Sequence, residues 1–443
     1  MALVISDLSK YVIAFFMAIF TLEGYLVFLH KKKNELNGIY IRQIICMFVV
    51  HFVGFSAICL ETGDFSYIIF YGFQQILLFA TIALFRVIYH EASRLIINNM
   101  CMLLAISFVV LTRLSFDKAI RQFVIVSVSL LVGLFVPFLV TKLKFLKNLT
   151  WIYGMTGAGL LLIVMVLGAV TNGSKISFSI AGVTFQPSEF VKIIFVFFIA
   201  SLLASGKELL QIVVASLAAS VHVLILVFSK DLGSALIFFV VYVVMVFVAT
   251  KNYFYLLLGN LAGVGAGYVA IKKFSHVRVR IQAWKDPWSY IDGSGYQIAQ
   301  SLFAIGTGGW FGMGIFQGDP TAIPYVEADF IFSAIAEEFG VVFAICLILV
   351  CLSCFIMFMI TALNIRDEFY KLIAVGLSIT YIFQVFLTVG GGTKFIPLTG
   401  VTLPLISYGG SSVLTTIIMF SIIQGLYALG LKEDVKEDED EEE

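Results

Sequence analysis

Long runs of hydrophobic residues, separated by short polar segments, repeat along almost the whole chain of 443 residues. Thirteen runs are close to the length of about twenty residues that a helix needs to cross a bilayer. The runs lack the alternation of polar and apolar residues that is typical of membrane β-barrel strands. We therefore predict an all-α polytopic membrane protein with spans at residues 11–30, 42–60, 67–85, 95–114, 123–141, 151–171, 190–204, 209–228, 232–249, 254–271, 340–363, 369–390 and 411–430.

Basic residues in the short loops indicate the orientation of these spans. Positive charge is enriched in short cytoplasmic loops, whereas long loops escape this rule. The basic loops alternate with loops poor in positive charge, and their residues include Lys32, Lys33, Arg86, Arg94, Lys142, Lys147, Lys207, Lys251, Arg366 and Lys371. We therefore expect the amino terminus and the long polar segment 274–328 outside, and the carboxyl terminus in the cytoplasm. The first run ends in lysines rather than in a small-residue cleavage site, so we expect an uncleaved span.

Composition agrees with a lipid environment. Charged residues make up 13% of the chain and hydrophobic residues 60%, whereas soluble domains carry about 25% charged residues. The six cysteines lie in apolar runs without the spacing of a zinc site or of a disulfide framework. The formal net charge of zero conceals a strongly acidic carboxyl-terminal segment. We expect membrane lipids as partners and no nucleic acid.

Polar motifs are distributed unevenly along the chain. The first three spans contain none, whereas the later spans alternate with outer loops that carry them. We therefore predict three parts: an accessory three-helix unit at residues 1–94, a ten-helix functional core at 95–431, and an acidic, disordered cytoplasmic tail at 432–443.

Asp329 is the leading candidate for chemistry, because it stands where the long outer segment meets an apolar run. A carboxylate at a bilayer boundary is costly to keep, which favours a function. The alternative is an acid that caps the following helix.

Three other charged residues allow two interpretations each. Glu189 and Lys192 lie three apart at the start of a span and share one face, so they either line a cavity or form only a structural ion pair. Pro187 suits the first turn of that helix, and Ser188 is a candidate cap. Asp231 is either functional or the cap of the next helix.

Six outer-face motifs follow one another in the order and spacing of a known family. The chain resembles the SEDS family, the RodA/FtsW/SpoVE group of bacterial elongation, division and sporulation proteins, from about residue 95 to residue 431. The motifs are FQPSEFVK at 185–192, DLGSA at 231–235, the segment 280–287, the glycine-rich segment 295–309, DFIF to EEFG at 329–340, and PLTGVTLP to SYGGSS at 397–412.

This resemblance implies a peptidoglycan glycosyltransferase that polymerises lipid II into glycan strands at the outer face of the bacterial cytoplasmic membrane. It also implies a class B penicillin-binding transpeptidase as the partner, and its characteristic acid falls on Asp329. The chain departs from the family pattern at Tyr325 and Ala328, just ahead of this acid, and at Lys230, where a proline is usual. We therefore expect a divergent member with extra amino-terminal helices.

Lipid II polymerisation requires a base and a means to neutralise a diphosphate leaving group. Asp329 is the expected base, and attack from the face opposite the leaving group predicts inversion at the anomeric carbon. Arg280 suits phosphate oxygens best among the outer-side cations, and a divalent cation such as Mg or Mn is a possible cofactor. The expected substrate-binding residues, all in or near the motifs, are Glu189, Lys192, Asp231, Arg280, Gln297, Lys394, Ser411 and Ser412.

Other interpretations stay open at the level of sequence. Arg278 and Arg280 are alternatively anchors for anionic lipid headgroups. His51 and His222 are lone histidines in apolar runs, so we expect packed side chains rather than metal ligands. A flippase or transporter of a lipid-linked oligosaccharide, and a non-catalytic cell-wall scaffold, are the rival functions. The clustering of motifs on one face favours the enzyme.

Overall fold

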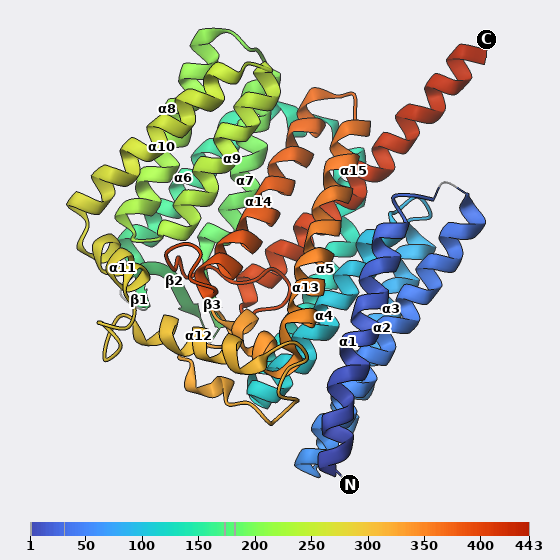
Figure 1. Cartoon of the computed structure of the whole chain (residues 1–443). Helices are drawn as coiled ribbons and strands as arrows, with labels where there is room; N and C mark the ends of the chain where they lie inside the picture. Colours follow the sequence, from blue (N-terminus) through green and yellow to red (C-terminus); the bar gives the residue numbers. More distant parts are fainter. Residues whose placement is uncertain (1, 31, 172–173, 181–182, 443) are drawn as a thin grey trace. The chain divides into compact units, whose positions relative to one another are not determined.

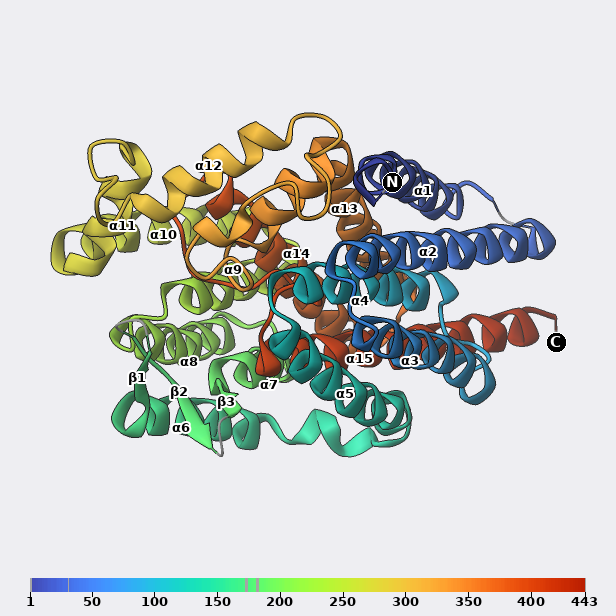
Figure 2. The same cartoon turned by 90° about the horizontal axis from the view of Figure 1, so that it is seen from below.

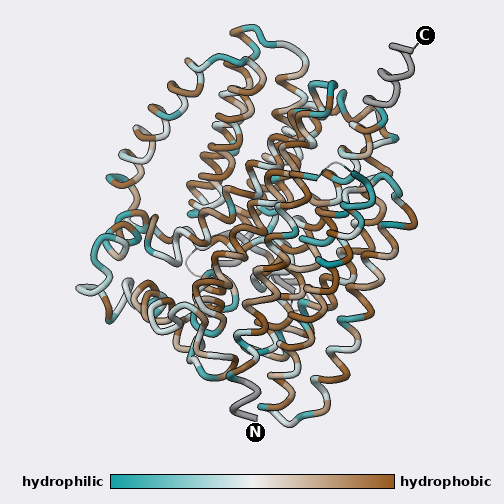
Figure 3. Tube along the Cα trace, turned by 45° about the vertical axis from the view of Figure 1, so that its right-hand side comes forward, coloured by the Kyte–Doolittle hydropathy of each residue, from teal (hydrophilic) through white to brown (hydrophobic). Residues whose placement is uncertain are grey.

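The computed structural model describes residues 2–30, 32–171, 174–180 and 183–442, and most of them are helical. Thirteen of the described helices are long and apolar enough to cross a membrane, which confirms the predicted number of spans. Hydrophobic residues predominate along the long helices, and hydrophilic residues gather near the helix ends (Figure 3). These helices are α1 (Ala2–Leu26), α2 (Lys33–Thr62), α3 (Ser66–Ile88), α4 (Arg94–Leu114), α5 (Phe116–Lys142), α6 (Thr150–Leu167), α7 (Pro187–Ala204), α8 (Leu209–Phe228), α9 (Leu232–Thr250), α10 (Tyr253–Lys273), α13 (Ile331–Asn364), α14 (Glu368–Gly392) and α15 (Gly410–Glu442).

Short elements occupy the connections between the spans. The outer segment 274–328 was predicted only as a loop, but it contains α11 (Ser275–Lys285), α12 (Tyr296–Gly308) and the 3₁₀ turn η2 (Pro320–Ala322). A second 3₁₀ turn, η1 (Lys144–Asn148), precedes α6. Three strands that the hydropathy pattern did not predict form a small antiparallel sheet in the order β1 (Ala169–Thr171), β2 (Ser174–Ile180) and β3 (Val183–Phe185). The spans were predicted from long apolar runs, so the short alternation of Ile176, Phe178 and Ile180 with polar residues in β2 was missed.

The chain forms two compact units, each built from three separate segments. Unit 1 comprises Met1–Leu131, Ala283–Met357 and Val385–Gly409, and unit 2 comprises Val132–Gln282, Phe358–Gln384 and Gly410–Glu443. Figures 1 and 2 show the elements of both units in sequence colours. The predicted boundary at residue 94 falls inside unit 1, so the accessory helices and α4 belong to one compact body.

In unit 1, α4 is the central helix of the amino-terminal part. Every residue from 95 to 112 is buried, as expected for a helix that is hydrophobic all round. Helices α2 and α3 pack against α4, and α1 packs against α2. The guanidinium of Arg42 on α2 donates to Glu23 on α1 at 2.6 and 2.8 Å. His51 on α2 contacts Gln74 and Gln75 on α3 at 2.9 and 2.8 Å, so both ring nitrogens are occupied within the helix packing.

Helix α13 is broken at Gly340, which has a φ of 84°. The outer chain that follows α12 supplies the missing backbone partners. Met313 N donates to Glu337 O at 2.9 Å, and Val341 N donates to Gly309 O at 2.9 Å. A Cβ atom at position 340 would collide with the backbone of the outer chain, so only glycine fits here. The break therefore joins α13 to residues 309–314 of the outer chain through backbone hydrogen bonds.

In unit 2, α7 lies against α6, α8, α9 and α15, whereas α10 packs on α9 and has no buried residue. The exposed side chains of α10 are mainly apolar, which suits contact with lipid. His222 on α8 bonds Ala218 O through Nδ1 at 2.9 Å and packs on the rings of Phe195 and Phe198. This environment is that of a packed histidine.

The backbone of α15 continues to Glu442, whereas the sequence predicted a disordered tail from residue 432. Glu and Lys are good helix formers, and the helix that precedes this segment supplies a nucleus from which it can extend. The side chains beyond Lys432 lie outside the described residues.

Candidate active site

An ion pair at the start of α7 is the centre of the polar site in unit 2. Pro187 occupies the first turn, as predicted, and Gln186 precedes it at the cap position. Lys192 Nζ lies 2.8 Å from Glu189 Oε2, and the two side chains are only 3% and 7% exposed. Charges in such a place need close partners, because each loses the solvation of water. The contact expected from the spacing of three residues is confirmed.

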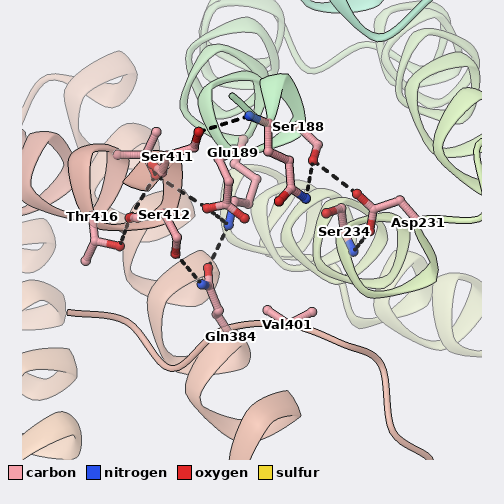
Figure 4. Close-up of polar contacts among 12 residues, drawn as sticks. Ser188, Glu189, Asp231, Ser234, Gln384, Val401, Ser411, Ser412 and Thr416 are labelled. Atoms are coloured by element: carbon pink, nitrogen blue, oxygen red, sulfur yellow. Dashed lines mark hydrogen bonds and ion pairs between the residues drawn. The ribbon is translucent and has the colours of Figure 1, made fainter. Parts of the chain in front are cut away.

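Helices α14 and α15 supply further partners to this pair. Lys192 Nζ donates to Gln384 Oε1 at 2.7 Å, and Gln384 Nε2 donates to Ser412 Oγ at 3.4 Å. Thr415 Oγ1 donates to Glu189 Oε2 at 3.4 Å. Figure 4 shows Glu189, Gln384 and Ser412 of this group, which come from three different helices. The result is a buried hydrogen-bonded network within one unit.

The network extends to α9 through the serine of the first motif. Ser188 Oγ donates to Asp231 Oδ2 at 3.0 Å, and Asp231 Oδ1 accepts from Ser234 N at 3.1 Å (Figure 4). Asp231 therefore caps α9, as its alternative interpretation stated. The predicted capping role of Ser188 is wrong, because its residue lies inside the helix and α7 has no side-chain cap.

Five of the predicted substrate-binding residues thus come together in unit 2. Ser411 joins them because its Oγ accepts from Gln186 N at 2.9 Å. The five residues are Glu189, Lys192, Asp231, Ser411 and Ser412. Gln384, which bonds to Lys192, was missed by the sequence reasoning. The sequence did contain a signal for Gln384, because an amide in the middle of an apolar run is rare. The structure shows that its side chain is buried.

Arg280 lies on α11 in unit 2, in a positively charged neighbourhood. Burial lowers the pKa of His276, and the charges of Arg280 and Lys230 lower the pKa further. Lys230, which replaces the proline usual in the family, has a φ of 64°. Arg278 is exposed and donates to Lys272 O at 2.9 Å. The arrangement gives Arg280 a cationic setting that suits an anion.

Asp329 lies in unit 1, two residues before α13. Tyr325, with a φ of 59°, directs its carbonyl oxygen to Ala328 N at 3.0 Å and to Asp329 N at 3.1 Å. This turn contains Tyr325 and Ala328, the two positions before Asp329 at which the sequence departs from the pattern of the family that it resembles. Asp329 Oδ2 faces Gly400, where an added Cβ would lie 3.7 Å away. The carboxylate is half-buried, and it lies beside the backbone of the motif that contains Gly400.

Gln297 and Lys394 also belong to unit 1. Gln297 is half-buried in the first turn of α12. Lys394 has a φ of 60°, and its carbonyl oxygen accepts from Trp284 Nε1 at 3.0 Å. The structure thus divides the predicted residues between the two units, with Asp329, Gln297 and Lys394 in unit 1.

Glu337 and Glu338 hold the outer chain in front of α13. Glu338 Oε1 accepts from Arg113 Nε at 2.8 Å and from Phe316 N at 3.1 Å. Glu337 Oε1 accepts from Asp319 N at 3.0 Å. Both acids therefore organise the polar interior of unit 1. Arg113, at the end of α4, was missed, although an arginine that interrupts an apolar run is a signal of the same kind.

No group of three or more His, Cys, Asp or Glu side chains that could hold a metal ion occurs among the residues that the structure describes. A structural cation cage needs several such ligands. The described side chains therefore do not fit a metal held by the protein alone.

A family model for FtsW/RodA/SpoVE, described as cell cycle proteins, matches residues 86–428. Peptidoglycan glycosyltransferase RodA of Mycobacterium tuberculosis (strain ATCC 25618 / H37Rv) is 38% identical over 292 residues, which are 62% of this chain and 62% of RodA. Stage V sporulation protein E of Bacillus subtilis is 31% identical over 300 residues, with 65% of this chain and 81% of that protein covered. A solved structure of a peptidoglycan synthase complex matches with a TM-score of 0.66 and 25% identity, covering 76% of this chain and 98% of the other.

Proposed function

This chain belongs to the FtsW/RodA/SpoVE family, and from that premise we propose that it is a peptidoglycan glycosyltransferase that polymerises lipid II at the outer face of the cytoplasmic membrane. The observation that carries the proposal is the buried network around Lys192, which joins residues from three family motifs. The chain spans 62% of the length of the Mycobacterium tuberculosis relative, which is named a peptidoglycan glycosyltransferase. The activity of the whole protein is therefore our proposal.

Asp329 acts as the general base in this proposal. It accepts the proton of the acceptor sugar hydroxyl as the hydroxyl attacks the anomeric carbon of the donor. A carboxylate within hydrogen-bond reach typically contributes about 10²–10⁴-fold to the rate. Attack opposite the diphosphate inverts the anomeric centre, by the logic of inverting glycosidases. The half-buried position of Asp329 supports access for a substrate hydroxyl.

Arg280 neutralises the diphosphate as it leaves. A planar guanidinium matches two phosphate oxygens at once, whereas an ammonium group acts as a point charge. Glu189, Lys192 and the hydroxyls of Ser411 and Ser412 bind the polar part of the substrate. Asp231 positions these side chains through its hydrogen bond with Ser188 at the start of α7. Gln297 and Lys394, which belong to unit 1, are further proposed substrate-binding residues.

A divalent cation, Mg or Mn, belongs to the proposal as an ion carried by the substrate diphosphate. Magnesium is commonly bound through one or two carboxylates together with substrate phosphates, and keeps several waters. This arrangement needs no cage of protein ligands. Addition of a chelator, followed by restoration of Mg or Mn, tests the requirement in the polymerisation assay.

A class B penicillin-binding transpeptidase is the proposed partner. The matching solved structure is described as coordinating polymerization and crosslinking in a peptidoglycan synthase complex. Those words concern that complex, and they support the same pairing for this chain. Co-purification of the full chain with the transpeptidases of its own organism is the direct measurement.

One experiment separates the enzyme from its rivals. The full chain in liposomes, supplied with labelled lipid II and no nucleotide, should yield glycan polymer. Translocation of lipid II without polymer would favour a flippase, and neither activity, with or without the transpeptidase, would favour a scaffold. An Asp329→Asn preparation run in parallel is the matched control for contaminating polymerases.

Arg280→Ala should weaken polymerisation by about tenfold or more, because removal of one charged hydrogen-bond partner typically costs about 1.5–3 kcal/mol. Arg280→Lys should restore only part of the rate, since it keeps the charge and loses the planar fork. Initial rates at limiting lipid II provide the measurement. Arg278→Ala on the same exposed helix is the control, and wild-type rates for both Arg280 variants would reject the diphosphate role.

We propose that the amino terminus lies outside the membrane and the carboxyl terminus in the cytoplasm. Contacts at the start of α1 support this orientation: Lys10 Nζ donates to Met313 O at 3.5 Å, and the rings of Tyr11 and Phe311 lie 5.4 Å apart. The beginning of the chain thus meets the long outer segment within unit 1.

Cysteines introduced at Asp7 and at Lys432 should be labelled from opposite sides of the membrane. Both residues are exposed, and an odd number of spans separates them. A membrane-impermeant maleimide applied to intact cells should react at position 7 alone. Labelling of both cysteines from the same side would contradict the arrangement of thirteen spans. The six native cysteines require replacement first.

A further inference from the structure

An ion pair joins the outer end of α5 to the segment that carries Asp329. Lys118 Nζ contacts Glu327 Oε1, and the side chains are 40% and 18% exposed. Glu327 lies two residues before Asp329 in the chain. The same ammonium group lies 6.0 Å from the centre of the Tyr408 ring. Lys118 therefore contacts two segments that are about eighty residues apart in the sequence.

The two segments are also bonded to each other. Tyr408 N donates to Glu327 O at 2.8 Å, and Ser407 Oγ donates to Ala328 O at 2.5 Å. Both acceptor carbonyls belong to the two residues immediately before Asp329. The backbone that leads into the carboxylate is consequently held along its length by residues 407 and 408.

A second side chain of α5 holds the same segment. Gln122 Nε2 donates to Ser407 O at 3.1 Å, and Gln122 Oε1 accepts from Gly409 N at 3.4 Å. Residues four apart share one face of a helix, so Lys118 and Gln122 act from one face of α5. Gln122 is fully buried and Lys118 is not.

We propose that Lys118 and Glu327 are positioning residues for polymerisation, which fix the backbone before Asp329 and so set the place of its carboxylate. The inference rests on the proposed function, in which Asp329 is the base. Tyr325 and Ala328 replace the usual family residues in this segment, and its backbone enters the left-handed region at Tyr325. The ion pair supplies a side-chain restraint at this divergent turn.

Magnitudes favour positioning over stability. Partly exposed ion pairs contribute little to the stability of a fold, so loss of this pair should leave the protein folded. Catalysis is more sensitive, because a displacement of about 1 Å in a reacting group can cost about 100-fold in rate. The pair should therefore affect turnover far more than melting.

The test uses the full chain in liposomes with labelled lipid II and compares four variants. Glu327→Gln and Lys118→Met should each lower kcat by about tenfold or more, with KM and the melting temperature close to wild type. Lys118→Arg should retain most of the rate because it keeps the charge. The exchange Lys118→Glu with Glu327→Lys should be clearly faster than Glu327→Gln or Lys118→Met, because it restores an ion pair between the two positions.

The Lys147–Asp367 pair in unit 2 is the matched control. Its side chains are 41% and 29% exposed, and Lys147 lies 5.3 Å from the centre of the Tyr370 ring, much as Lys118 lies near Tyr408. Exchange of its charges should leave kcat unchanged. Wild-type kcat in Glu327→Gln, or an exchange variant as slow as the single changes, would overturn the positioning role. Absence of polymer from the wild-type chain would instead reject the proposed function itself.

Discussion

Asp329→Asn should lower polymerisation by at least about 100-fold, because general-base catalysis typically contributes about 10²–10⁴-fold. The amide keeps the size of the carboxylate and does not accept the hydroxyl proton at neutral pH. Lipid II binding and melting temperature should stay close to wild type, since the side chain is only half-buried. The measurements are single-turnover polymer formation and equilibrium binding of labelled lipid II.

The helix-cap interpretation of Asp329 predicts a different order of variants. Asn caps a helix nearly as well as Asp, so under that interpretation Asp329→Asn would be almost silent. In the proposed mechanism Asp329→Glu is also slow, because the added methylene shifts the base by about an ångström and alignment supplies much of the catalysis. Near-normal polymer from a well-folded Asp329→Asn protein would remove this residue from the mechanism and reopen the transporter and scaffold interpretations.

Lys192→Met should destabilise the protein and abolish polymerisation together. The change leaves Glu189 buried without its cation, and breaking a buried ion pair from one side costs about 3–5 kcal/mol. Gln384 also loses the donor for its Oε1 atom. Thermal unfolding in detergent should show a clear decrease in the melting temperature, and the liposome assay should show no polymer.

The double variant Glu189→Gln with Lys192→Met separates folding from function. Removal of both charges relieves the cost of an unpaired buried ion, so stability should return towards wild type. Activity should not return, because the variant lacks the two charged side chains, Glu189 and Lys192, of the proposed substrate site. Lys207→Met, in a pair with Glu368 whose side chains are 45% and 39% exposed, provides the control and should cost no more than about 1 kcal/mol. Full activity of the double variant would assign the pair a purely structural role.

The motif residues show which contacts can be predicted from spacing within one helix and which cannot. Glu189 and Lys192 are three apart on a helix, so the helical repeat alone brings them onto one face. Their ion pair could therefore be predicted from the sequence. Gln384 lies almost two hundred residues away and contacts Lys192 only because α14 packs near α7 in unit 2. No periodicity within a single span contains that contact.

The segment around Asp329 shows the same division. Its position at the start of a span was visible from the change of polarity, and the candidate base was chosen on that ground. The bonds of Glu327 to Lys118 and Tyr408 depend on three distant segments meeting. The break at Gly340 likewise became clear only from the outer chain that pairs with it.

The sequence by itself determined the thirteen spans, because a bilayer imposes one length and one polarity on every helix that crosses it. It also determined which residues are unusual enough in lipid to propose a function. The tertiary structure decided which of those residues meet, and it placed the accessory helices in one compact unit with α4. Side-chain contacts between helices depend on how each helix is rotated and which neighbours it packs against, and hydropathy leaves both free.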